Sequence, residues 1–146
     1  MMEQRFQLTW QGDAIRALVT QGIIAGLNEF HLDVEREAKR NLQPGRGVIT
    51  GTARRSIHAA SPSYSWGGDD VSPTPGTPER GGTGGLPEAQ EDMVIGTIGS
   101  GLVYARSLHD GHGSFQGYHY ITLAYAREQP HLPDKLQKHT KKLGLT

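Results

Sequence analysis

One long helical pattern near the start of this chain of 146 residues constrains the fold more than any other feature. Apolar residues recur there at spacings of three and four, at Ile15, Leu18, Val19, Ile23, Leu27, Phe30, Val34 and Ala38. Since an α-helix has 3.6 residues per turn, this spacing places them on one face of a helix of about eight turns. Such a helix is long for a domain of this size. Part of its apolar face therefore packs either on a neighbouring subunit or on the chain's own sheet.

Residues at the ends and in the middle of this pattern refine the prediction. Asp13 is a suitable N-cap, and Pro44 followed by Gly45 ends the helix. Gly22 and Gly26 lie four residues apart within it, and each weakens a helix by up to about 1 kcal/mol. Glycines at that spacing either let another backbone pack closely or mark a bend.

The composition limits what the chain can do. Only 35% of the residues are hydrophobic, while glycine and proline number 20 and 8, so the core must be built from part of the chain. We expect one domain spanning residues 1–146. The absence of cysteine excludes disulfides and cysteine-based zinc sites. No apolar run approaches the ~20 residues that cross a bilayer, so we expect a soluble protein made in the cytosol, with no membrane partner.

Charge is unevenly distributed along the chain, although the net charge is +0. This overall balance argues against a free-standing nucleic-acid binder held mainly by phosphate contacts. Residues 1–60 carry a net charge of +2, residues 61–100 carry −5, and residues 101–146 carry +3. The pattern suggests head-to-tail contact between identical subunits; the alternative is solvated charge without a partner.

Shorter patterns predict a small sheet and further helix. Residues 6–10 and 56–60 read as short strands, and residues 93–99, rich in β-branched side chains, form the clearest strand. We expect the second and third of these strands to pair in an antiparallel sheet. Residues 120–123 form a final strand or lead directly into a helix. Leucines and lysines over residues 132–143 predict a basic, amphipathic C-terminal helix.

Residues 61–92 interrupt regular structure with seven glycines and five prolines, and we expect a long exposed loop or arm. A loop of this length is uncommon in a compact domain unless it binds something or is disordered. Tyr64 and Trp66 anchor the loop if it docks on a neighbour; otherwise they fold back on their own domain. The fold class is therefore α+β: a long N-terminal helix packed on a small antiparallel β-sheet, with a C-terminal helix and a long Gly/Pro-rich loop.

Residues that could carry chemistry do not converge in the sequence. His109, Asp110, His112 and His119 are the densest set of possible metal ligands, yet the first histidine pair lies three apart across a glycine. Helical metal-binding pairs lie four apart, so we expect loop histidines that hydrogen-bond or face water. Ser107, His109 and Asp110 are the residue types of a Ser–His–Asp catalytic site. Because residues so close in a chain rarely point at one centre, we do not expect them to form one. We predict no catalytic residue, no metal and no cofactor, since the glycine-rich segments also fit no phosphate-loop template.

Arg54 and Arg55 are the more informative polar pair. Arginine presents a rigid fork of donors that suits both carboxylates and phosphates. Three uses stay open: a solvated pair beside a strand, an interface with acids of an adjacent subunit, and contact with passing DNA. With Tyr64 and Trp66, these are the candidate subunit-interface residues.

A series of short motifs extends over nearly the whole chain. They are Trp10-Gln11-Gly12, Ala38-Lys39, Pro44, Thr50-Gly51-Thr52-Ala53-Arg54-Arg55-Ser56-Ile57, Ile98-Gly99-Ser100 and Tyr104-Ala105. In order and rough spacing they resemble the small head–tail connector proteins of tailed bacteriophages, the family named after the tenth gene product of phage HK97. The chain departs from that pattern at Ala53, where leucine is usual, and at Leu108-His109-Asp110-Gly111, which replaces a Glu-x-Gly. Its 61–92 insert is also longer.

The resemblance implies a structural virion protein and not an enzyme. It implies a homo-oligomeric ring, a hexamer or dodecamer, at the neck or tail end of a siphovirus-like virion made in the bacterial host cytoplasm. Its neighbours would be head-closure and tail-tube or tail-terminator proteins, and genomic DNA would pass through without sequence-specific contact. In that ring, an acidic 61–100 segment facing the channel eases the passage of DNA by repulsion. The alternatives are a tail terminator that caps the tail tube and, from another class, a DNA-binding or metal-dependent enzyme.

Overall fold

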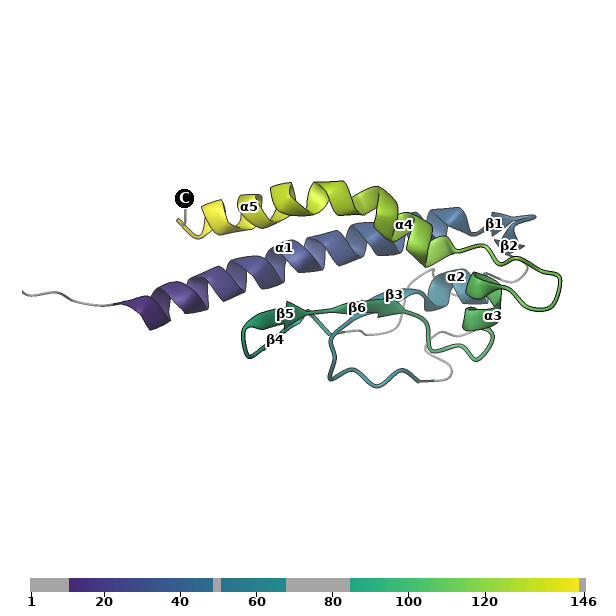
Figure 1. Ribbon diagram of the computed structural model, residues 1–146, viewed down its shortest axis with the longest axis horizontal. Coiled ribbons are helices and arrows are strands. Elements are labelled where there is room, and N and C mark those ends of the chain that lie inside the picture. Colours follow the sequence, from purple (N-terminus) through teal and green to yellow (C-terminus); the bar gives the residue numbers. More distant parts are fainter. Residues whose placement is uncertain (1–10, 49–50, 68–84, 145–146) are drawn as a thin grey trace, which may run out of the picture.

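A computed structural model describes residues 11–48, 51–67 and 85–144 of the protein. Within them, helix α1 (Gly12–Asn41) lies between two layers (Figure 1). Helices α4 (Tyr120–Glu128) and α5 (Leu132–Lys142) cover one side of it, and short strands cover the other. The α+β class, the long N-terminal helix and the C-terminal helix are confirmed. Among the described residues, no helix combines the length and the apolar content needed to cross a membrane.

The strands and the shorter helices are small. Their bounds are β1 Gln43–Pro44, β2 Gly47–Val48, α2 Thr52–Ser56, β3 His58–Ala60, β4 Glu88–Gln90, β5 Met93–Ile95, β6 Thr97–Gly99, α3 Ala105–Asp110 and the 3-10 helix η1 Gln129–His131. Strands β3 and β6 are antiparallel, with Ala59 opposite Ile98, and β4 and β5 form a second antiparallel pair. The small antiparallel sheet expected from the sequence is therefore confirmed. Strands β1 and β2 form a separate parallel pair.

The prediction of a strand over residues 56–60 was wrong at its start. Ser56 is the last residue of helix α2, and strand β3 begins only at His58. The Ser56 hydroxyl donates to the Ala53 carbonyl at 2.7 Å, which closes a helical turn where an extended strand was expected. Gly51 precedes this turn with φ at 80°, a left-handed conformation that glycine adopts without strain.

The predicted strand over residues 93–99 is interrupted at Gly96, so β5 and β6 pair with different partners. A Cβ atom at Gly96 would lie 2.6 Å from Nδ1 of His31, which means that only glycine lets the chain pass so close to α1. Residues 120–123 adopt the helical alternative, as the first turn of α4.

The loop predicted over residues 61–92 was wrong at its C-terminal end. Strand β4 lies within this segment and pairs with β5 across a tight turn, in which Glu91 has a left-handed φ of 52°. Residues 61–67 lack helix and strand, as expected of a loop. Residues 68–84 of the insert, and the strand predicted over residues 6–10, lie outside the described residues.

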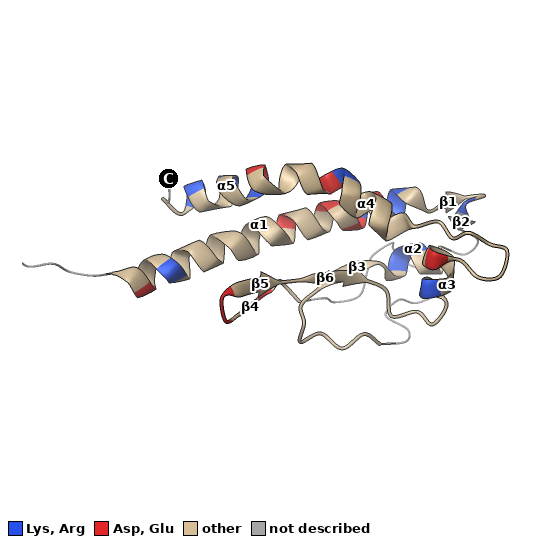
Figure 2. Ribbon diagram, in the orientation of Figure 1, with Lys and Arg blue, Asp and Glu red and all other residues tan. Residues whose placement is uncertain are grey.

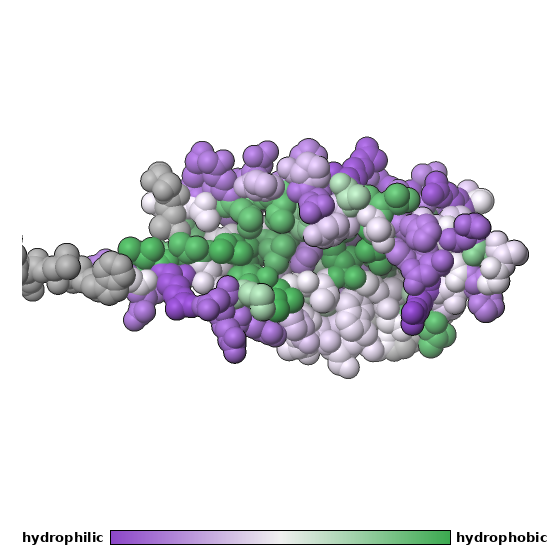
Figure 3. Space-filling view, viewed as in Figure 1, coloured by the Kyte–Doolittle hydropathy of each residue, from purple (hydrophilic) through white to green (hydrophobic). Residues whose placement is uncertain are grey.

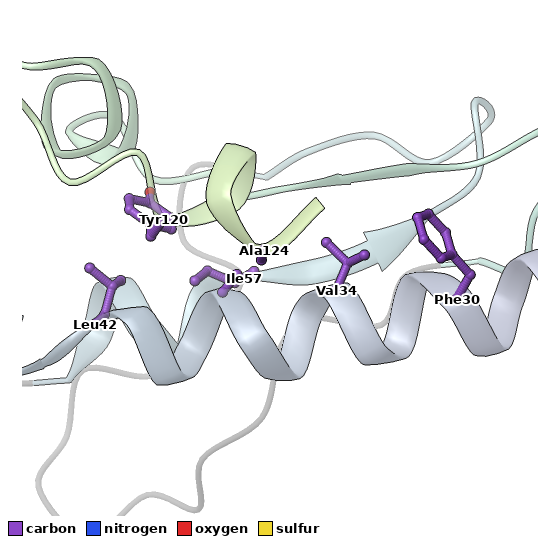
Figure 4. Close-up of a cluster of buried hydrophobic side chains, with 7 residues drawn as sticks. Phe30, Val34, Leu42, Ile57, Tyr120 and Ala124 are labelled. Atoms are coloured by element: carbon purple, nitrogen blue, oxygen red, sulfur yellow. The ribbon is translucent and has the colours of Figure 1, made fainter. Parts of the chain in front are cut away.

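The core lies at the C-terminal half of α1. Phe30, Val34, Ala38 and Leu42 pack there with Ile57, Tyr120 and Ala124 (Figure 4). The Tyr120 hydroxyl donates to the Ala105 carbonyl at 3.2 Å, and burial raises the pKa of Tyr120 to about 12, so this donor stays protonated. This contact ties α4 to α3.

The two glycines of α1 are contact points for α5. A Cβ at Gly26 would lie 3.0 Å from Cα of Leu136, and one at Gly22 would lie 3.4 Å from Cα of Thr140. Of the two sequence alternatives, close packing against another backbone is therefore the one realised. Beside this contact, Glu29 accepts hydrogen bonds from His139 at 2.5 Å and Lys138 at 3.0 Å, which lower the pKa of its carboxyl.

Candidate functional site

Basic side chains gather where the C-terminal end of α1 meets α2 and α4. They line two adjoining surface hollows of about 320 and 470 Å³, and we call them the basic end: Arg36, Lys39, Arg40, Arg54 and Arg127. Glu37, with only 9% of its side chain exposed, organises part of this surface. Its carboxylate accepts from Arg40 at 2.7 Å and lies 3.3 Å from Nη1 of Arg127. Buried acids of this kind fix the direction in which the surrounding guanidinium groups point.

The structure separates the roles of Arg54 and Arg55, which the sequence treats as a pair. Both lie in the last turn of α2 and both are half-buried. Arg54 lines both hollows of the basic end. The Arg55 guanidinium lies instead against Gly51, where a Cβ would come within 3.0 Å of its Nη1. Arg54 is therefore the better interface candidate, and Arg55 packs on the turn that begins α2.

An acidic tip lies far from the basic end, at the turn between β4 and β5 (Figure 2). We call Glu88, Glu91, Asp92 and the exposed Met93 the acidic hairpin. Asp92 forms an ion pair with Arg16 of α1, and Glu88 accepts a hydrogen bond from Ser63. That bond and one from Ser61 lower the pKa of Glu88, so its carboxylate stays charged at neutral pH.

Exposed apolar residues lie along the N-terminal half of α1, beside the acidic hairpin (Figure 3). Ile15 is 51% exposed, Leu18 38% and Val19 36%. A groove of about 320 Å³ runs between this part of α1 and the hairpin, and Val19 and Met93 contribute to its walls. The apolar face recognised in the sequence is therefore divided: its C-terminal half forms the core, and its first turns face outward.

Tyr64 and Trp66 form an aromatic cluster with His58. Their ring centroids lie 5.0 and 4.5 Å from the His58 ring and 5.3 Å from each other. His58 Nδ1 donates to the Ser56 carbonyl at 2.9 Å, and the Trp66 ring covers Gly99 of β6. Both aromatics thus fold back on their own domain, the second of the sequence alternatives. Their role at a subunit interface stays a prediction.

The histidine segment is more ordered than the sequence suggests. His109 Nε2 accepts from the Thr122 backbone N–H at 3.3 Å, so its other nitrogen, Nδ1, carries the proton and donates to Asp110 at 2.7 Å. His109 thereby caps the N-terminus of α4 from outside that helix, and its hydrogen bond holds the pKa of Asp110 below its ordinary value. The His119 ring meets the His109 ring edge-on, with centroids 5.6 Å apart. Sequence reasoning named these residues but missed that they converge.

Two of the motifs that carry the family resemblance lie close together in the fold. Ser56, the last residue but one of the arginine motif, shares a 2.5 Å hydrogen bond with Ser100 of the Gly-Ser motif. Ala105 accepts from Tyr120 as described above. Trp10 and Thr50 lie outside the described residues.

Comparison of the chain with protein-family models, curated proteins and solved structures finds no match. The resemblance to phage connector proteins therefore rests on the sequence motifs alone.

Proposed function

We propose that this chain is a structural virion protein of a tailed phage, and that its copies form a ring at the head–tail interface. The ring joins or completes the tail and leaves a channel for DNA. The observation that carries the proposal is the separation of the acidic hairpin from the basic end, with exposed apolar side chains beside the hairpin.

Two unlike surfaces on one chain favour a head-to-tail contact between copies. The acidic hairpin carries the exposed Glu91 beside Asp92, which already pairs with Arg16. The basic end carries Arg54 beside Arg40, which already pairs with Glu37. A contact between different surfaces of identical chains is heterologous, and it builds a closed ring when the rotation between neighbours closes. Opposite charges at such a contact steer the two copies together and fix their register.

The exposed start of α1 supplies apolar surface for the same contact. Ile15, Leu18 and Val19 lie together on successive turns, and none of them belongs to the core. Contiguous exposed apolar surface beside charged groups is typical of an interaction site. Burial of such surface contributes a favourable hydrophobic term of about 25 cal/mol per Å², which is offset in part by the entropy lost on association. We assign this surface to a neighbouring copy, which is one of the two destinations that the sequence leaves open.

The fold is also compatible with the family pattern from which the role is inferred. The Ser56–Ser100 hydrogen bond joins two of the motifs, and Gly51 makes the turn before the arginines. These contacts join the arginine motif to the residue that follows β6, and Arg54 lines the surface hollows of the basic end. They support a structural use of the motif.

The decisive test deletes this gene from the phage genome that carries it and images the resulting particles by electron microscopy. Filled heads separate from finished tails are the expected result, because the joining ring is absent. Overlong tails would instead assign the chain to tail termination, the runner-up role. Intact virions of normal yield would overturn the proposal.

A further inference from the structure

We infer that His109, Asp110 and His119 form a binding site for a divalent transition-metal ion, with Zn²⁺ as the best-suited ion. Each of these residues directs one possible ligand atom to the same region, and the three atoms lie within 4.8 Å of one another. Two imidazoles and a carboxylate are a donor set that suits zinc and the neighbouring divalent metals. The inference is independent of the proposed function.

The backbone holds the three residues in place. The His119 N–H donates to the His109 carbonyl at 2.9 Å, which joins the two ends of the intervening loop. Within that loop, His112 and Phe115 exchange two backbone hydrogen bonds of 3.0 Å. A Cβ at Gly111 would lie 2.9 Å from N of Gly117, so these two glycines allow the two ends of the loop backbone to come into contact. A site whose ligands are fixed in advance loses little conformational freedom on binding.

The distance between two of the donor atoms is close to the distance that a bound zinc ion requires. His109 Nδ1 and Asp110 Oδ1 are 2.7 Å apart and share one proton. A tetrahedral zinc ion with bonds of about 2.0–2.2 Å separates its donors by about 3.3 Å, so the pair must open only slightly. The ion takes the place of the Nδ1 proton. That proton leaves for solvent and a proton from solvent binds Nε2, so the ring stays neutral, and the Thr122 backbone N–H, which donates to Nε2 in the metal-free chain, gives up this hydrogen bond.

The surroundings provide a partner for the changed His109 ring. The Thr122 hydroxyl lies 3.2 Å from His109 Nε2 and can accept the proton that this nitrogen then carries. Metal-bound histidines usually donate their second N–H in this way, which orients the ring. Arg106 lies 3.6 Å from the other Asp110 oxygen, Oδ2, and leaves Oδ1 for the metal. A hollow of about 280 Å³ reaches His109 and Asp110, so an ion has access from solvent.

Isothermal titration calorimetry of the full-length, untagged chain with ZnCl₂ tests the site. We expect one Zn²⁺ per chain, and a loss of affinity of more than about tenfold in His119→Asn. Asparagine suits this variant because it tolerates the left-handed φ of 48° at position 119. His112→Asn is the matched control, since His112 lies on the same loop but outside the cluster, and it should bind zinc like the unchanged chain.

A second variant keeps the test independent of any damage to the loop. Asp110→Asn removes the ligand charge at a residue whose side chain is 55% exposed, and we expect a similar loss of affinity. The inference is overturned if the unchanged chain takes up no stoichiometric zinc. It is equally overturned if His112→Asn weakens zinc binding as much as His119→Asn does, because binding then depends on surface histidines in general and not on the cluster.

Discussion

At the scale of single residues, His31 is a titratable group held inside the fold. Its ring packs against Gly96, and among the described residues its Nδ1 has no hydrogen-bond partner. Burial lowers the pKa of His31 from its ordinary value of 6.5, because desolvation penalises the charged form. A histidine whose pKa is lower in the folded state stabilises the fold above its unfolded pKa. This contribution is lost as the pH falls below that value and through the folded pKa.

We therefore expect the free energy of unfolding to decrease as the pH falls from about 7 to about 5, and His31→Gln to reduce that decrease. Urea titrations of both chains at a series of pH values provide the measurement. His131→Gln serves as the control, because His131 is exposed in η1. A difference in stability between unchanged chain and His31→Gln that stays constant over this pH range would contradict the assignment.

Gly51 is a second residue with a definite role, at the turn before the arginines. It shares a left-handed φ with Gly45, at 80° and 82°, but only Gly51 faces a neighbouring side chain, that of Arg55. Alanine costs about 1 kcal/mol in either left-handed turn, and at position 51 it also displaces Arg55. We expect Gly51→Ala to lower the urea midpoint more than Gly45→Ala. Equal losses would show that the Arg55 contact contributes nothing.

At the scale of elements, the packing of α1 on α5 depends on its two glycines. Gly26→Ala improves the intrinsic helix propensity by up to about 1 kcal/mol, but its Cβ would lie 3.0 Å from a backbone atom of Leu136. Forced separation of packed elements costs about 1–3 kcal/mol, so we expect net destabilisation. Gly22→Ala should cost less, because there the nearest backbone atom is 3.4 Å away. Thermal unfolding of both variants checks this order, and a higher melting temperature for Gly26→Ala would refute it.

The helix α1 could be predicted from the sequence because its periodicity is local. The division of its apolar face could not, since burial depends on where other elements end. Phe30 and Val34 pack in the core with Ile57 and Ala124, whereas Ile15 is exposed. The same limit explains the error at Ser56, where a side-chain bond to Ala53 outweighs a strand pattern.

The candidate sites show a similar limit. Arg54 and Arg55 are adjacent in sequence. Only the orientation of α2 shows that Arg54 lines the basic end while Arg55 packs on Gly51. The convergence of His119 on His109 requires the closed loop between α3 and α4 and a left-handed residue at its end. Sequence spacing carries neither feature, so the convergence of these possible ligands could be found only from the fold.

At the scale of the whole molecule, one chain carries an acidic hairpin and a distant basic end (Figure 2), and in the ring that we propose each would meet a different neighbour. Arg54 belongs to the basic end, and Glu91 is the exposed turn residue of the acidic hairpin. In a ring, each copy uses both surfaces, so a charge reversal at either one affects every contact. A double reversal on the same chain restores opposite charges across each contact, which separates an interface effect from damage to the fold.

The last prediction therefore concerns Arg54→Glu, Glu91→Lys and their combination, each supplied in place of the deleted gene. We expect each single reversal to lower the fraction of heads joined to tails, because like charges then meet across every subunit contact. The double variant should recover part of that fraction, as counted by electron microscopy. Arg106→Glu makes the same charge change at a side chain that is 92% exposed and outside the basic end, and it should join heads to tails normally. If the double variant does no better than Arg54→Glu alone, the hairpin and the basic end do not meet, because a shared contact requires recovery.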